Sequence, residues 1–83
     1  MPIAPEDLDD NYAIGERLRA ERERLGLQVH ELGHMCGCTV LAQKRMEAGS
    51  KPITAEYLHA LHHRTDARVL WIVSGEEAPA ATD

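Results

Sequence analysis

The chain contains no phenylalanine and few aromatic residues of any kind. Among its 83 residues, Tyr12, Tyr57 and Trp71 are the only tyrosines and tryptophan. Aromatic side chains usually contribute much of the area that a core buries, so aliphatic side chains must form most of the core here. A chain of this length is expected to form one domain with a modest core.

Long apolar segments and cysteines are also scarce. No apolar run approaches the roughly 20 residues that a membrane span needs. Residues 1–10 are acidic, without the basic and apolar regions of a secretory signal. The only cysteines, Cys36 and Cys38, are too close in sequence for a disulfide framework. These absences predict a cytoplasmic protein with no membrane partner.

The net charge of −5 is unevenly distributed. Residues 1–10 hold four acids and no base, and residues 76–83 hold three acids and no base. The other seven acids and all nine bases lie in residues 11–75, so that part has a formal charge of +2. We therefore expect a disordered acidic arm at 1–10, a folded domain at 11–75 and a flexible tail at 76–83. A slightly basic body with acidic ends can still bind phosphate groups.

Apolar spacing and capping residues predict an all-α fold. In the first segment, Ile14, Leu18 and Leu25 recur at spacings of four and seven residues, which places them on one helical face. For the last segment a strand is the alternative, because residues 68–73 are mostly β-branched or aromatic; its helix would be capped by Thr65 and Asp66. The expected helices span residues 12–25, 29–36, 40–48, 54–63 and 67–73.

The stretch Gln28–Gly49 carries the clearest local pattern. Gln28 and Glu31 approximate a capping box at the start of one helix. Thr39 is a good N-cap for a second helix, and Gly49 a good residue just past its end. Two short helices joined by a tight turn containing glycine form a helix-turn-helix unit.

The sequence resembles the phage-repressor and Cro type (XRE-like) of helix-turn-helix family over about residues 12–76. The matching pieces are Leu25-Gly26-Leu27, Glu31-Leu32, Gly37-Cys38-Thr39, Arg45-Met46-Glu47-Ala48-Gly49 and the segment Val69–Glu76. This resemblance implies a compact five-helix bundle of the lambda-repressor-like DNA-binding type, whose third helix enters the major groove. It also implies a structural ion pair between Arg22 and Glu47.

The resemblance further implies a DNA-binding face, centred on a recognition helix at residues 39–48. Arg45 is expected to contact guanine, because its guanidinium can bond two acceptors of that base at once. Arg17, Arg19, Lys44 and Lys51 are candidate phosphate contacts. The residues expected to bind DNA are Gln28, Val29, Thr39, Val40, Leu41, Ala42, Lys44, Arg45 and Lys51.

Some positions depart from the family pattern. Val29, Val40 and Leu41 are apolar where polar contact residues are usual, Ala48 replaces a polar or basic residue, and Gln43 stands where the family has a buried Ile or Val. Exposed apolar clusters often mark protein-binding sites. The alternative function is therefore a protein-interaction module on the same fold, such as an antitoxin or a phage-encoded inhibitor, docking through Val29, Val40 and Leu41.

Other chemistry finds little support in the sequence. His30, His34, Cys36 and Cys38 would suit a metal or thiol sensor, but their spacing is poor for zinc. The two cysteines are expected in the core, so we predict no metal site and no cofactor. His59, His62 and His63 are expected to lie partly on a solvent face. No catalytic arrangement is present, and we predict that the protein is not an enzyme.

The sequence thus favours a transcriptional regulator of phage or prophage type, acting as a repressor on double-stranded DNA. A palindromic operator implies a homodimer. Because no second domain is evident, we expect the dimer either to form through the last expected helix or to form only on DNA. The interface residues of that helix are Val69, Leu70, Trp71, Ile72 and Val73.

Overall fold

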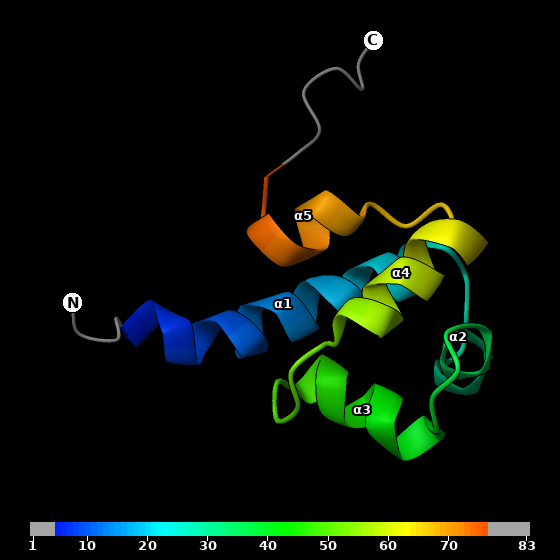
Figure 1. Cartoon of the computed structure of the whole chain (residues 1–83), viewed down its shortest axis with the longest axis horizontal. Helices are drawn as coiled ribbons and strands as arrows, with labels where there is room; N and C mark the ends of the chain where they lie inside the picture. The colour runs from blue at the N-terminus through cyan, green and yellow to red at the C-terminus, as the bar shows by residue number, and fades with distance from the viewer. Residues whose placement is uncertain (1–4, 77–83) are drawn as a thin grey trace, which may run out of the picture.

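The computed structural model describes residues 5–76, which form five α-helices and no strand (Figure 1). The predicted all-α class is confirmed, and the alternative of a strand near residue 70 is wrong. None of the helices described is both long and apolar enough to cross a membrane. The helices are α1 (Pro5–Arg24), α2 (Val29–Met35), α3 (Val40–Ala48), α4 (Ala55–Arg64) and α5 (Val69–Ser74).

Helix α1 starts seven residues earlier than its predicted start at Tyr12. The expectation of a disordered arm over residues 1–10 is therefore wrong for residues 5–10. Proline suits the first position of a helix, because the N–H that it lacks would have no partner inside the helix. Pro5 takes that position. Residues 1–4 and 77–83, on which the rest of the expected arm and tail fall, lie outside the described residues.

Capping residues set the ends of α2 and α3, as predicted. The Glu31 carboxylate accepts the backbone N–H of Gln28 at 2.7 Å. Thr39 Oγ1 accepts the backbone N–H of Ala42 at 3.0 Å, and Gly49 follows α3 with a φ of 83°. Only a residue that tolerates a positive φ can end the helix in this way.

Helix α5 begins two residues later than predicted. The N-cap is Arg68, because Thr65 Oγ1 instead accepts the N–H of Ala67 at 3.0 Å and forms a turn before the helix. Thr65 also donates its hydroxyl to the carbonyl of Leu61 at 2.7 Å, so its side chain belongs to the end of α4.

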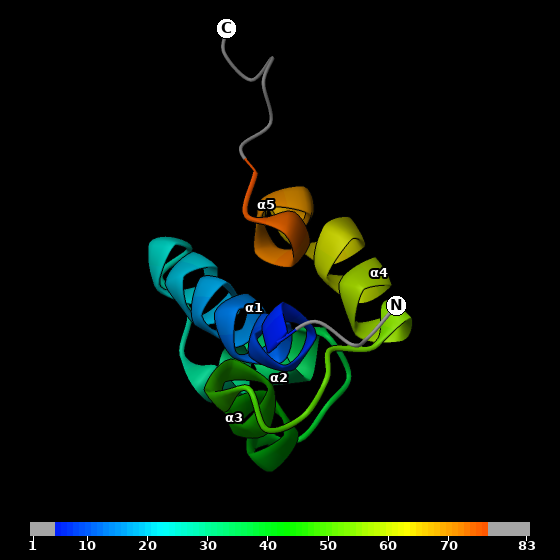
Figure 2. The ribbon, with the colours of Figure 1, turned by 90° about the vertical axis from the view of Figure 1, so that its left-hand side faces the viewer.

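Helix α1 lies at the centre of the bundle and packs against α3 and α5, which lie on opposite sides of it (Figure 2). Helix α2 packs against α3, and α4 packs against α2 and α5. Every helix contributes at least one side chain to a single core, and most of these side chains are aliphatic, as expected. The buried core residues are Leu18, Leu32, Met46, Tyr57, Leu61 and Ile72.

The crossing of α1 and α3 depends on Gly15. A Cβ atom at this position would lie 2.7 Å from the backbone oxygen of Glu47 and still closer to that of Met46. Both of these atoms are backbone, so neither can move aside without shifting α3. Gly15 therefore allows the backbones of α1 and α3 to approach closely.

Gly15→Ala should lower the free energy of unfolding by about 1–3 kcal/mol, because the added methyl group overpacks the helix crossing. The sign is diagnostic, since Gly→Ala inside a helix ordinarily stabilises by about 1 kcal/mol. Urea unfolding measures the change. Gly33→Ala is the matched comparison and should lose less, because its Cβ would lie 3.3 Å from the nearest atom, the carbonyl oxygen of Cys38. Unchanged or greater stability in Gly15→Ala would refute this account of the crossing.

A buried carboxylate joins α1 to the start of α5. Glu21 is 1% exposed, and its oxygens accept hydrogen bonds from the Arg24 guanidinium at 2.7 and 3.0 Å. They also accept the backbone N–H of Arg68 at 2.7 Å and its guanidinium at 2.9 Å. Burial alone would raise the pKa of Glu21, but these hydrogen bonds outweigh it and lower the pKa to about 2.

Glu21→Gln should lower the free energy of unfolding at pH 7 by about 2 kcal/mol, because the charged hydrogen bonds are lost. The pKa of Glu21 is lowered on folding, so its stabilisation is complete above about pH 4.5 and is lost as the pH falls towards about 2. Urea unfolding between pH 6 and pH 2 should therefore give a shallower acid loss in Glu21→Gln than in the wild type. Glu23→Gln, at an exposed ion pair with Arg19, should follow the wild type. Parallel acid losses in the wild type and Glu21→Gln would contradict the role of Glu21.

Candidate functional site

Helix α3 presents one side to the core and the opposite side to solvent. Gln43 and Met46 are buried, and Glu47 is nearly so. The exposed side chains recur at positions i, i+3, i+4 and i+7, which line up along one helical stripe. We call this stripe, with the first residue of the helix, the outer face of α3; it consists of Val40, Leu41, Lys44, Arg45 and Ala48.

The outer face of α3 is cationic. No ion pair joins Lys44 or Arg45 to a carboxylate of residues 11–76. The only acid of α3, Glu47, points inward and is neutralised by Arg22. An anion approaching this face would therefore meet two positive charges and no opposing negative charge from α3.

A hollow of about 290 Å³ lies beside the outer face of α3, between α1, α2 and α3. Val29 and Arg19 lie on its rim together with Lys44, and we call it the basic hollow. Arg19 reaches Glu23 at 3.2 Å in an exposed ion pair, which is worth little in water. The structure thus brings Val29 and Arg19 together with the exposed stripe of α3. The full lining is Arg19, Arg22, Val29, Lys44, Glu47 and Ala48.

Other predicted DNA contacts lie elsewhere. Gln28 and Thr39 are exposed at the starts of α2 and α3. Ala42 and Lys51 line a different hollow on the side of α3 that carries Met46. Arg17 donates from Nε to the carbonyl of Ile72 at 2.8 Å and therefore lies on the α5 side of α1. Arg17, a candidate phosphate contact, is therefore not part of the outer face of α3.

The predicted ion pair between Arg22 and Glu47 is present. Arg22 donates from Nε to Glu47 Oε2 at 2.7 Å and from Nη2 to Oε1 at 3.1 Å, so the pair is bidentate. The two side chains are only 11% and 8% exposed. The hydrogen bond with Glu47 raises the pKa of Arg22. Arg22 also donates from Nη1 to the carbonyl of Leu27 at 2.9 Å, so one guanidinium joins α1, α3 and the segment before α2.

Sequence reasoning missed the polar network that continues from this ion pair. Gln43 is fully buried and donates from Nε2 to Glu47 Oε2 at 2.8 Å, while its Oε1 accepts the Tyr57 hydroxyl at 2.7 Å. Among the described residues, no buried side-chain nitrogen or oxygen lacks a hydrogen-bond partner. The signal in the sequence was Gln43 itself, a polar residue at a position expected to be aliphatic. Its partner on α4 could be identified only from the fold.

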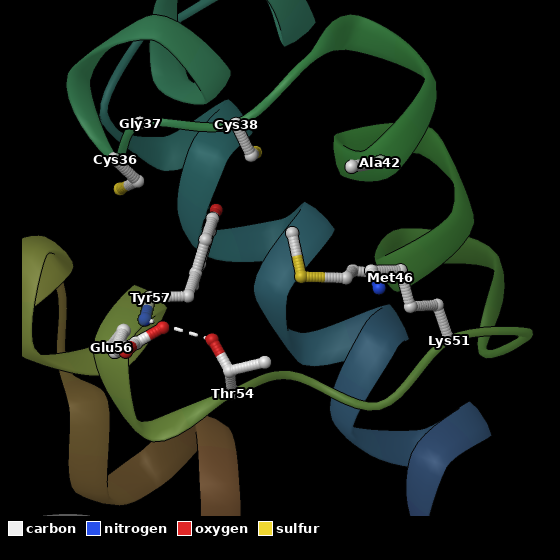
Figure 3. A pocket seen from close by; sticks show the side chains of 9 residues that line it. All are labelled: Cys36, Gly37, Cys38, Ala42, Met46, Lys51, Thr54, Glu56 and Tyr57. Atoms are coloured by element: carbon white, nitrogen blue, oxygen red, sulfur yellow. Dashed lines mark hydrogen bonds between the residues drawn. The ribbon is translucent and has the colours of Figure 1, made fainter.

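Both cysteines line the hollow on the Met46 side of α3, which has a volume of about 140 Å³ (Figure 3). Figure 3 shows the Tyr57 side chain pointing toward Cys36 and Cys38, with Met46 beside it. Both thiols are free, half-buried and packed against the core. Burial raises the pKa of each thiol, so both are protonated at neutral pH. This supports the expectation of structural cysteines, although neither is fully buried.

The histidines of α2 and α4 lie on the surface of the protein. His30 and His34 are exposed on α2. His59, His62 and His63 are exposed on α4, as expected, with the His59 and His63 rings 4.3 Å apart between centroids. In the part of the chain that the structure describes, no three His, Cys, Asp or Glu side chains gather in a way that could hold a metal ion.

The residues predicted for a dimer interface on α5 divide into two groups. Ile72 is fully buried in the core of its own chain, so its assignment to an interface is wrong. The three-residue spacing places Val69 on the same side as Ile72, and both Val69 and Trp71 pack partly against the core. Leu70 and Val73 remain exposed. A six-residue helix must bury one side to be stable, and that side cannot also bind a partner.

Comparison with known proteins identifies no relative: no protein-family model matches the chain, and no curated protein or solved structure matches it significantly. Function is therefore inferred from the outer face of α3, the basic hollow and the sequence resemblance.

Removing either partner of the Gln43–Tyr57 hydrogen bond should destabilise the fold. Removing both partners should destabilise it by less than the two single losses added together. Gln43→Leu and Tyr57→Phe should each lower the free energy of unfolding by about 1–3 kcal/mol, because a buried polar group is left without its partner. In the double variant both partners of this bond are gone and neither is left without the other, so its loss should fall short of the sum by about 1 kcal/mol. Urea unfolding of all four proteins gives the coupling energy. Strict additivity would indicate that the bond adds nothing to stability.

Proposed function

We propose that this protein is a sequence-specific DNA-binding transcriptional regulator of the phage-repressor type, in which α2 and α3 form the helix-turn-helix. The observation that carries the proposal is the outer face of α3: an exposed helix face with two cations that form no ion pair with any carboxylate of residues 11–76. In this proposal α3 enters the major groove, whose width admits one α-helix. The protein acts in the cytoplasm as a repressor and needs no cofactor.

The positions of the cations support this function. Residues at the start of a recognition helix approach base edges, and Arg45 lies one turn further along the exposed stripe. Lys44 and Arg19 line the basic hollow, and their positive charges suit a phosphate of the DNA backbone there. Phosphate contacts fix the register of a protein on the duplex, and base contacts provide specificity. Arg45 is thus assigned to a base, and Lys44 and Arg19 to the backbone.

The charge of the chain limits the affinity. Residues 11–75 carry a formal charge of only +2, so non-specific attraction to DNA is weak, and most of the affinity must come from a matched site. A homodimer would supply this, with half-sites about 10 bp apart. Leu70 and Val73 are the exposed apolar residues of α5 that such a dimer would cover.

The second candidate function is a protein-interaction module on the same fold. It is favoured by Val40 and Leu41, which are 42% and 54% exposed and do not pack against the core. With Val29 they would form the apolar surface through which this protein, acting as an antitoxin or a phage-encoded inhibitor, docks on its target protein. Such a module would bind no DNA duplex at low salt.

Random-duplex selection with the full chain tests the first proposal. We expect a single enriched motif, whose affinity falls steeply with salt because counterions are released. Arg45→Ala should weaken binding to the selected duplex by about 1–3 kcal/mol, and Lys44→Ala should reduce the salt slope by about one. Arg64→Ala is the control, since Arg64 lies on α4 and donates to the carbonyl of Met35. An Arg45→Ala variant with unchanged affinity would exclude Arg45 from the site, and absence of any enriched duplex would favour the interaction module.

A further inference from the structure

The outer face of α3 begins with two large apolar side chains. Val40 and Leu41 are the first two residues of the helix, and both point into solvent. Exposed hydrophobic side chains this large are few in the described part of the chain, and only these two are adjacent in sequence. They occupy the positions from which a recognition helix touches base edges, so they define what this helix can recognise there.

Aliphatic side chains can discriminate among base edges only by contact with an apolar group of the base. Neither side chain can donate or accept a hydrogen bond, and pressing it against a polar base edge removes water without replacing its hydrogen bonds. The apolar group that the four ordinary bases present in the major groove is the C5 methyl of thymine. The C5 methyl of 5-methylcytosine occupies the equivalent position on a pyrimidine ring.

The charges around the pair favour DNA over a protein as the occupant. Lys44 and Arg45 lie one turn along the same face, four residues after Val40 and Leu41 respectively. No carboxylate of α3 is exposed beside them, because Glu47 is paired with Arg22. An apolar pair next to two cations complements a methyl group in the groove of a polyanion. A protein partner would need acidic residues placed beside an apolar patch.

We propose that Val40 and Leu41 read pyrimidine C5 methyl groups, so that the protein selects thymine at these positions and binds more tightly when a cytosine there is methylated. The inference rests on the proposed DNA-binding function and identifies the base chemistry that it recognises. Packing one methyl group against an aliphatic side chain should change affinity about four-fold. Methylation of the site would thereby regulate binding.

The test begins with two randomised 20-bp duplex pools, one made with thymine and one with uracil throughout, each selected with the full chain. The selected duplex is then remade with single thymine-to-uracil replacements, and with cytosine or 5-methylcytosine at the same positions. At one or two positions per half-site, uracil should weaken binding about four-fold, and 5-methylcytosine should bind about four-fold tighter than cytosine. Fluorescence anisotropy at low salt measures each affinity.

Matched variants assign the effect to residues. Leu41→Ala should reduce the thymine–uracil difference to less than about two-fold, and the nearly isosteric Val40→Thr should reduce it at the neighbouring position. Tyr12→Ala should leave the difference intact, since Tyr12 is also a large exposed side chain, at 58%, but lies on α1. All three positions are exposed, so the variants should fold.

The outcomes separate the two levels of inference. Equal affinity for thymine and uracil at every position, or a selected motif without thymine, would overturn methyl reading and leave DNA binding intact. Methyl reading would also be overturned if the Leu41→Ala and Val40→Thr variants both kept the full difference in affinity between thymine and uracil. If neither pool enriches at low salt, the DNA-binding function fails, and methyl reading fails with it.

Discussion

The ion pair between Arg22 and Glu47 determines where α3 lies. Its atoms are almost fully buried, so removing one partner would leave a buried charge and cost about 3–5 kcal/mol. The pair does not stand alone, because Gln43 joins Glu47 to the Tyr57 hydroxyl. One chain of hydrogen bonds thus connects α1, α3 and α4. It fixes which side of α3 faces the core, and therefore which side is left exposed to solvent.

Helix α3 buries Met46 and exposes Lys44 and Arg45 in the usual way, but two positions on each side depart from the usual distribution of polarity. The buried side holds Gln43 and Glu47, whose polar atoms are satisfied, so their burial carries no penalty for missing hydrogen bonds. The exposed side begins with Val40 and Leu41, which remain in contact with water in the free protein. Covering these two side chains releases free energy only when a partner binds. In the proposed function, the stability of the fold and the specificity of binding therefore depend on different residues of one short helix.

Helix α5 is held by a second buried charge. Six residues are too few for a stable isolated helix, and α5 has no side-chain cap from Arg68 at its start. Glu21 provides a substitute by accepting the Arg68 N–H from α1, and Arg17 bonds the carbonyl of Ile72 near the other end. These bonds, together with burial of Ile72, turn Leu70 and Val73 outward. The exposed part of α5 is consequently smaller than the segment's apolar sequence indicates.

The sequence by itself determined the features that depend on neighbouring residues. Thr39 and Gly49 marked the ends of α3 because capping involves groups only a few residues apart, and the resemblance of the sequence to phage repressors predicted the partner of Arg22. Tertiary structure alone decided that Glu21 also binds Arg68 and that Gln43 binds Tyr57, which lie 47 and 14 residues away along the chain. It also decided that Ile72 belongs to the core and Leu70 to the surface. In a short run of apolar residues, the sequence does not show which side chain will be buried and which will be exposed. Packing of α5 against α1 decides this.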